Sequence, residues 1–149
     1  HEDVGYNYRL SNLLAAVGRG QLERLEELLE RRRTVHQRYR EGLADVEGIE
    51  FAPRAPWGDP NHWLTVVRLR PQVYGATRDE ALAALAARGI EARPAWKPMH
   101  LQPVFAGHPF RGGSVAEAVF VEGLCLPSGS ALDPADQDEV IEILRGRRG

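Results

Sequence analysis

A long run of apolar residues at helical spacing, between Ser11 and Leu43, constrains the fold of this chain more than any other feature. Leucine, valine and tyrosine recur every three or four residues through this run, and arginines and glutamates fill the positions between them. This period is typical of one long amphipathic helix with a single buried stripe. Gly18 and Gly20 each weaken a helix by about 1 kcal/mol relative to alanine, so we expect a bend or a close helix contact near them.

Two strands and a helix are predicted in the middle of the chain. β-Branched and aromatic side chains indicate a strand at residues 63–69, after a proline-rich loop at residues 52–61. Residues 77–80 have the capping-box pattern, in which a threonine oxygen and a glutamate satisfy backbone N–H groups at a helix start. The helix that follows is expected to stop at Gly89, and residues 90–93 resemble a short strand.

The last third of the chain supplies two further helices and one further strand. A second capping-box pattern at residues 114–117 predicts a short helix, and residues 124–127 predict a brief buried strand. Asp133 and Pro134 have the residue types of an N-cap and a first helical position, so they open a final helix. This order predicts one domain over residues 1–149, of α/β (α+β) class, with a small sheet covered by helices and a long N-terminal helix.

Composition narrows the classes of function. The chain has 21 acidic and 19 basic residues, so no net charge favours a nucleic-acid or membrane partner. The single cysteine, Cys125, lies in an apolar run, which indicates a small core residue in a reducing compartment. No apolar stretch approaches the ~20 residues that cross a bilayer, and the first residues lack a signal-peptide pattern. We therefore expect a soluble cytoplasmic protein.

One candidate binding segment lies near the start of the chain. Tyr6 and Tyr8 bracket Asn7, and Arg9 follows them. A guanidinium and an amide can hold a phosphate, while two aromatic rings can pack against a flat ring. The segment therefore has the residue types of a cofactor or nucleotide site.

A second candidate segment runs from Arg93 to Pro103. It holds two cations, an indole, an imidazole and an amide among three prolines, and its candidate ligand-binding residues are Arg93, Trp96, Lys97 and His100. This set suits a polar, charged ligand such as a sugar joined to a diphosphate, because proline stiffness lowers the cost of ordering the loop. A purely structural loop is the alternative interpretation.

The remaining polar signals have simpler interpretations. The five histidines are scattered without metal-ligand spacing, so we expect no metal site. His36 is expected on the surface of the long helix, and His62 in a structural hydrogen bond at a strand entrance. Arg31 to Arg33 follow several glutamates at helix-neighbour spacing, which favours a salt-bridged face over a nucleic-acid patch.

The motifs together resemble the C-terminal region of the DegT/DnrJ/EryC1/StrS sugar aminotransferases. The resemblance begins with Gly5-Tyr6-Asn7-Tyr8-Arg9-Leu10-Ser11-Asn12 and continues, in the order of the family, through His62-Trp63, through Arg93-Pro94 with Trp96-Lys97-Pro98-Met99-His100, and through Leu126-Pro127-Ser128-Gly129-Ser130. It spans essentially the whole chain. The Trp-Lys-Pro-Met-His form looks most like members that aminate a 4-keto-6-deoxy UDP-N-acetylhexosamine, on the route to bacillosamine-type or capsular sugars.

The resemblance implies a fold type I, pyridoxal-phosphate-dependent enzyme that works as a homodimer on a nucleotide-sugar. Asn7 would match the asparagine that reaches across the dimer to the cofactor phosphate, with Tyr6, Tyr8 and Arg9 at the same edge. The substrate loop of the family would correspond to His100, Lys97 and Trp96, assisted by Arg93.

The family's larger N-terminal domain, which carries the cofactor lysine, does not match any part of this sequence. Lys97 is the only lysine and lies in the predicted substrate loop. We therefore expect no catalytic residue on this chain, no pyridoxal phosphate bound by it alone, and no transamination without the missing domain. The alternative is a non-catalytic dimerisation or nucleotide-sugar-binding module.

Overall fold

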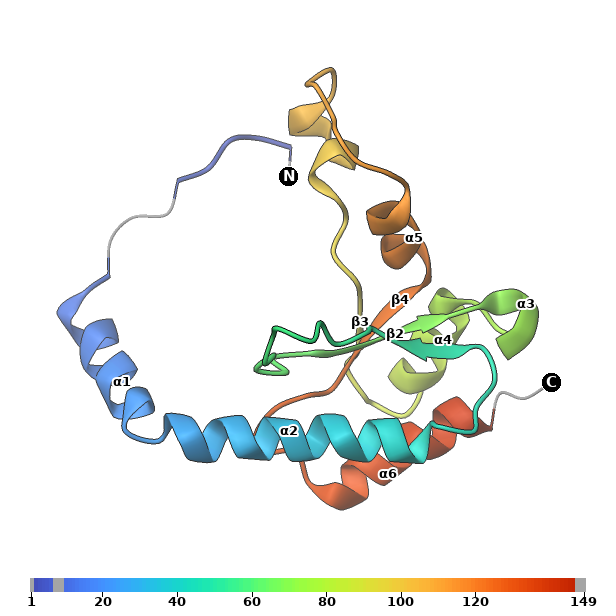
Figure 1. The fold of residues 1–149 in the computed structure, drawn as a ribbon, viewed down its shortest axis with the longest axis horizontal. Coiled ribbons are helices and arrows are strands. Elements are labelled where there is room, and N and C mark those ends of the chain that lie inside the picture. Colours follow the sequence, from blue (N-terminus) through green and yellow to red (C-terminus); the bar gives the residue numbers. More distant parts are fainter. Residues whose placement is uncertain (1, 7–9, 147–149) are drawn as a thin grey trace.

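The computed structural model describes residues 2–6 and 10–146, which form a small antiparallel sheet with helices on both of its faces (Figure 1). The fold class predicted from the sequence is confirmed. The helices and strands are, in chain order, α1 (Asn12–Leu22), α2 (Leu25–Gly42), β1 (Ile49–Phe51), β2 (Thr65–Leu69), α3 (Pro71–Tyr74), α4 (Arg78–Ala86), β3 (Arg93–Pro94), the 3-10 turns η1 (Met99–Leu101) and η2 (Pro103–Phe105), α5 (Val115–Glu122), β4 (Gly123–Leu126) and α6 (Pro134–Arg145).

The sheet has the strand order β1-β2-β4-β3, and every neighbouring pair is antiparallel. Strand β2 alternates between buried and half-buried residues, so Val67 and its buried neighbours face the main core while Arg68 faces the opposite side. On that opposite side, Arg68 Nη2 lies 2.5 Å from Glu122 Oε2 at the end of α5. Strand β4 is buried along its whole length, because it pairs on both edges and is covered on both faces.

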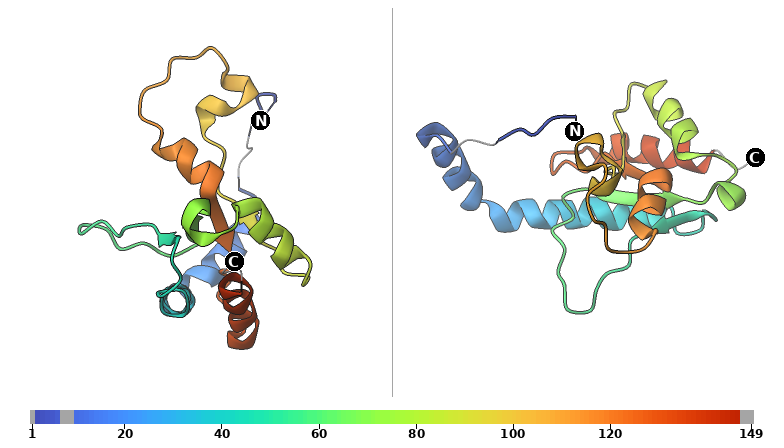
Figure 2. Two further views of the ribbon diagram at one scale, coloured as in Figure 1. Left: turned by 90° about the vertical axis from the view of Figure 1, so that its right-hand side faces the viewer. Right: turned by 90° about the horizontal axis from the view of Figure 1, so that it is seen from above.

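Helices α2 and α6 lie side by side against one face of the sheet, as the end-on view in Figure 2 shows. Tyr39 of α2 has no exposed surface, and its hydroxyl donates a hydrogen bond of 3.0 Å to the carbonyl of Pro127. Gln137 of α6 donates from Nε2 to the carbonyl of Val35 at 2.7 Å. Since unpaired buried polar groups are costly, these bonds fix how α2 and α6 pack.

The predicted single long helix is instead two helices. The chain turns at residues 23–24, and α1 then leans away from the body of the protein (Figure 1). Helix α1 has no buried residue, so the buried stripe is confined to α2, where Val35 and Tyr39 are buried. A side chain at Gly18 or Gly20 would meet no atom within 4 Å, so neither glycine marks a close helix contact.

Several local predictions are confirmed, and others are wrong in detail. The capping box of Thr77 and Glu80 forms, Asp133 caps α6, and Cys125 is 5% exposed. The strand expected at residues 90–93 is the two-residue β3, and no sequence pattern predicted β1. The second capping box does not form, because the side chain of its N-cap serine makes no hydrogen bond to the start of α5.

The arginine cluster on α2 has partners within the described part of the chain. Arg31 lies 2.6 Å from Glu27, Arg33 lies 2.8 Å from Asp59, and Arg32 donates to the carbonyl of Trp63 at 3.1 Å. These contacts agree with the predicted salt-bridged face. Within residues 2–6 and 10–146, no helix combines the length and the apolar character that crossing a membrane would require.

Candidate functional site

Two exposed tryptophans form the centre of the candidate site. Trp63 lies just before β2 and Trp96 just after β3, and their ring centroids are 5.8 Å apart. Their side chains are 59% and 60% exposed. Large apolar rings that remain this exposed next to each other are typical of a surface that contacts a ligand or another protein.

Both tryptophans line two hollows. The first, which we call the α2 hollow, has a volume of about 600 Å³ and is lined by His36, Gln37 and Arg40 of α2 and by the 52–64 loop. The second, the β3 hollow, has a volume of about 310 Å³ and is lined by strands β3 and β4 with the polar side chains of Glu91, Arg93 and Ser128. The tryptophan pair therefore contributes to the lining of both hollows.

Two stacked imidazoles form part of the wall of the α2 hollow. The rings of His36 and His62 are 3.9 Å apart and nearly parallel, and His36 Nδ1 lies 3.3 Å from Thr65 Oγ1. The stack requires His62 to adopt a φ of 48°, an uncommon left-handed conformation for a residue other than glycine. The expectation that His36 is a surface residue was wrong, since its ring is half-buried between His62 and Phe51.

The two rings are held neutral by their surroundings. Burial, together with the nearby His62 and Arg40, lowers the pKa of His36 to about 4. Burial also lowers the pKa of His62, with a second contribution from Arg54. A neutral imidazole has one donor and one acceptor nitrogen, so this wall of the hollow offers hydrogen bonds without charge.

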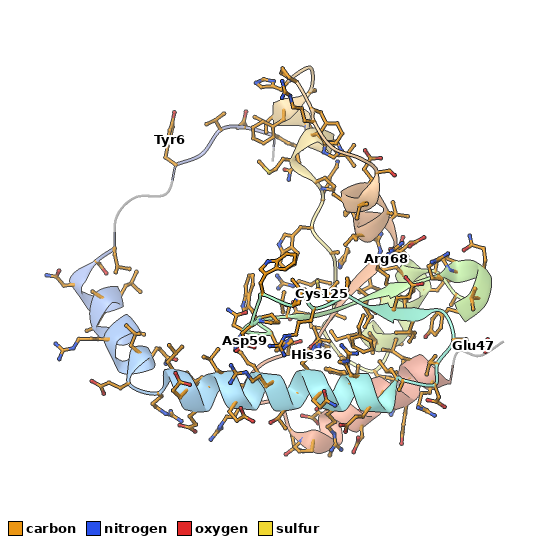
Figure 3. The ribbon with its side chains drawn as sticks, viewed as in Figure 1. Tyr6, His36, Glu47, Asp59, Arg68 and Cys125 are labelled. Atoms are coloured by element: carbon orange, nitrogen blue, oxygen red, sulfur yellow. The ribbon has the colours of Figure 1, made fainter. Side chains whose placement is uncertain are left out.

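The 52–64 loop is tied to α2 by charged side chains. Asp59 accepts from Arg33 of α2 at 2.8 Å and from Arg54 within the loop at 3.1 Å. Figure 3 shows Asp59 and His36 on the same side of α2, facing the strands. These bonds and the histidine stack join the outer wall of the α2 hollow to α2.

The predicted substrate residues are divided between two places. Trp96 and Arg93 line the β3 hollow, and Arg93 lies 2.6 Å from Glu91. Lys97 follows Trp96, and its side chain is exposed. His100 lines neither hollow; its Nε2 lies 2.9 Å from Glu117 Oε1 of α5.

Of the predicted cofactor residues, the structure describes only Tyr6, which lines neither hollow. Tyr6 is 78% exposed on the segment before α1, well apart from His36 in Figure 3. Asn7, Tyr8 and Arg9 lie outside the described residues. Among the residues that are described, no group of three histidine, cysteine or acidic side chains could hold a metal ion.

Sequence reasoning missed four residues of this arrangement as site residues: Trp63, His36, His62 and Glu117. Trp63 was assigned only to a strand, although an indole at a strand entrance next to a proline-rich loop is a usable signal. The histidine stack had no such signal, because it joins residues 26 positions apart through an unusual backbone conformation. Glu117 was assigned to a helix cap.

The sequence of this chain is similar to a known protein family and to individual members of it. The model of the DegT/DnrJ/EryC1/StrS aminotransferase family matches residues 1–145. EpsN of Bacillus subtilis, whose name describes it as a pyridoxal phosphate-dependent aminotransferase, is 45% identical over 97% of this chain. The GDP-perosamine synthase of Caulobacter vibrioides is 40% identical over 95% of it.

Solved structures of sugar aminotransferases and of members of this family also have the fold of this chain. DesV of S. venezuelae superimposes on the whole chain with a TM-score of 0.83 and 35% sequence identity. The chain spans only 37% of EpsN, 38% of the GDP-perosamine synthase and 40% of DesV.

The buried histidine stack predicts a pH-dependent stability. Because the pKa of His36 is about 4 in the folded chain and about 6.5 when unfolded, the unfolded chain binds more protons between these values. The stabilisation is complete above pH 6.5 and is lost as the pH falls towards 4. We expect a loss of about 1–2 kcal/mol after allowing for solvent screening. Urea unfolding at pH 7.5 and at pH 5 measures this loss in the free energy of unfolding. His36→Gln should lose less stability between the two pH values, and an equal loss in both proteins would contradict the prediction.

Proposed function

Because the chain belongs to the DegT/DnrJ/EryC1/StrS aminotransferase family, we propose that it is the C-terminal part of a pyridoxal-phosphate-dependent aminotransferase acting on a nucleotide-linked 4-keto-6-deoxy sugar. The sugar is of the bacillosamine or capsular-polysaccharide type. In this proposal the chain supplies the nucleotide-sugar surface, and the catalytic lysine belongs to a region outside it.

The observation that carries the proposal is the exposed tryptophan pair, which lines both hollows. An exposed indole can stack on a nucleobase, and stacking of this kind contributes about 1–3 kcal/mol per base. Arg93 and Lys97 flank Trp96 in sequence and can pair with a diphosphate. The α2 hollow, at about 600 Å³, lies within the usual range of small-molecule sites. Its neutral histidines and amides suit sugar hydroxyls.

The described residues do not fit a complete site for pyridoxal phosphate. Such a site needs a lysine amine, a carboxylate at the pyridine nitrogen and a phosphate cradle. Lys97, the only lysine, has an exposed side chain on the loop before Pro98, and no acidic side chain is bonded to it in the described part of the chain. We therefore derive no catalytic step on this chain and propose that it does not transaminate alone.

This lack of a cofactor site predicts the optical behaviour of the purified chain. When the chain is mixed with pyridoxal phosphate, no stable absorption band of a lysine-bound cofactor should appear in the visible region. Lys97→Ala serves as the control for a non-specific adduct. A stable yellow adduct that disappears in Lys97→Ala would overturn this part of the proposal.

Nucleotide-sugar binding is tested with two tryptophan variants. UDP-N-acetylglucosamine should bind the chain in calorimetry, and Trp96→Ala should weaken binding by about tenfold or more because it removes the stacking surface. Trp57→Ala is the matched control, since Trp57 is 89% exposed at the tip of the 52–64 loop and lines neither hollow. GDP- and dTDP-sugars, run in parallel, report base preference. Equal losses in both variants would contradict the assignment.

A second candidate function is a stand-alone nucleotide-sugar-binding or dimerisation module. It is favoured by the exposed pair of Trp63 and Trp96, because stacking of a nucleobase on these rings needs no catalytic lysine. Micromolar binding that His100→Ala abolishes is expected of both functions. Transamination of a 4-keto sugar once a lysine-bearing N-terminal domain of the family is added would support the aminotransferase, and its absence would support the module.

We also propose that the chain self-associates through α1. The exposed fractions of Leu14, Val17 and Leu22 are 56%, 56% and 67%, and an apolar hollow of about 310 Å³ lies between α1 and α2. Exposed apolar patches of this kind mark interfaces. In sedimentation, the chain should dimerise, Leu14→Glu with Val17→Glu should shift it to monomer, and Glu26→Gln should not. A monomer at every concentration would exclude this interface.

A further inference from the structure

Glu117 makes a contact that its place in the sequence does not predict. Its Oε1 lies 2.9 Å from Nε2 of His100, although the two residues belong to α5 and η1. The imidazole is also stacked on Phe110, with ring centroids 3.8 Å apart. The side chain of His100 is only 18% exposed, so the carboxylate and the phenyl ring together fix its orientation.

The chain contains an internal comparison for this contact. Thr77 and Glu80 have the same S/T-x-x-E pattern, and there the Glu80 carboxylate accepts the backbone N–H of Thr77 at 2.7 Å. The pattern at Ser114 and Glu117 forms no such box. A side-chain cap contributes about 1 kcal/mol to a helix, so α5 forgoes this stabilisation while Glu117 bonds to His100 instead.

The bond determines what the free nitrogen of His100 can do. In the neutral ring, Nε2–H donates to the carboxylate, which leaves Nδ1 as a hydrogen-bond acceptor. Within the described residues, Nδ1 makes no hydrogen bond. If Nδ1 were fully buried, it would be a buried polar atom without a partner, and among the described residues only Nε of Arg38 is in that state. Nδ1 is therefore accessible from outside the protein.

We propose that Glu117 is a positioning residue for a part of the nucleotide-sugar that extends beyond the two hollows: through its bond to Nε2 it orients His100 so that Nδ1 accepts a hydrogen bond from the ligand. This inference rests on the proposed function. A ligand group that suits an acceptor is an N–H or O–H donor, such as the imide of a pyrimidine base, the amide of an acetamido sugar or a sugar hydroxyl. A phosphate oxygen, which is itself an acceptor, is not suited to the neutral ring.

The test is a double-mutant cycle on UDP-N-acetylglucosamine binding, measured by calorimetry at pH 8 on the same chain. Glu117→Ala should weaken binding about three- to tenfold, the range of one net hydrogen bond, and should have no further effect in a His100→Ala background. Glu117→Gln keeps an acceptor oxygen and should restore most of the affinity. Glu80→Ala, which breaks a true capping box, should lower the melting temperature without changing affinity.

A proton NMR readout separates the two hypotheses. The Nε2–H of His100, protected by the carboxylate, should give a downfield imidazole resonance that disappears in Glu117→Ala. If His100→Ala weakens binding and Glu117→Ala does not, the positioning role is overturned while the proposed function stands. If the wild-type chain binds no nucleotide-sugar although the resonance is present, the proposed function fails and the ligand role of Glu117 fails with it. An effect of Glu117→Ala that persists in the His100→Ala background also overturns the proposal.

Discussion

The packing of α2 against α6 and the sheet is the constraint on which the rest of the structure depends. Tyr39 is fully buried and bonded to the Pro127 carbonyl, and Gln137 reaches across to Val35, so the helix can neither rotate nor slide without leaving a buried polar group unpaired. Because α2 is fixed on its core face, its next residues, His36 and Arg40, are fixed towards the α2 hollow. One helix, α2, therefore packs against the core with one face and lines the α2 hollow with another.

The outer wall of the site is held by polar contacts rather than by burial. The 52–64 loop contains three prolines, which stiffen it, and Asp59 joins it to Arg33 of α2. Its one large apolar side chain at the tip, Trp57, is exposed. The arginines of this region are used mainly to attach the loop, while the histidines remain neutral. The result is a cavity with ion pairs at its rim, lined by neutral imidazoles and by the guanidinium groups of Arg40 and Arg54.

The sequence predicted local structure well where the cause was local. The capping box at Thr77 and the N-cap at Asp133 form because their partners lie two or three residues away. The same pattern at Ser114 forms no box: the serine side chain makes no cap bond, and Glu117 is bonded to His100 instead. The long apolar stripe was read correctly as helical, but its first half is exposed, since periodicity shows which side chains share a face and not whether anything covers that face. Strand β1 was missed because three residues carry too little pattern without their partner in β2.

The sequence by itself determined helices α4, α5 and α6, the helical character of α1 and α2, three of the four strands and the lack of an internal disulfide. It also determined the resemblance to the aminotransferase family, which the family match confirmed. These follow from neighbours within a few residues and from motifs that keep their order along the chain. Tertiary structure alone decided that Trp63 meets Trp96, that His36 stacks on His62, and that the candidate substrate histidine is oriented by Glu117. Each of these contacts joins segments that the sheet and its loops bring together, and no local propensity encodes a distance between segments so far apart in the chain.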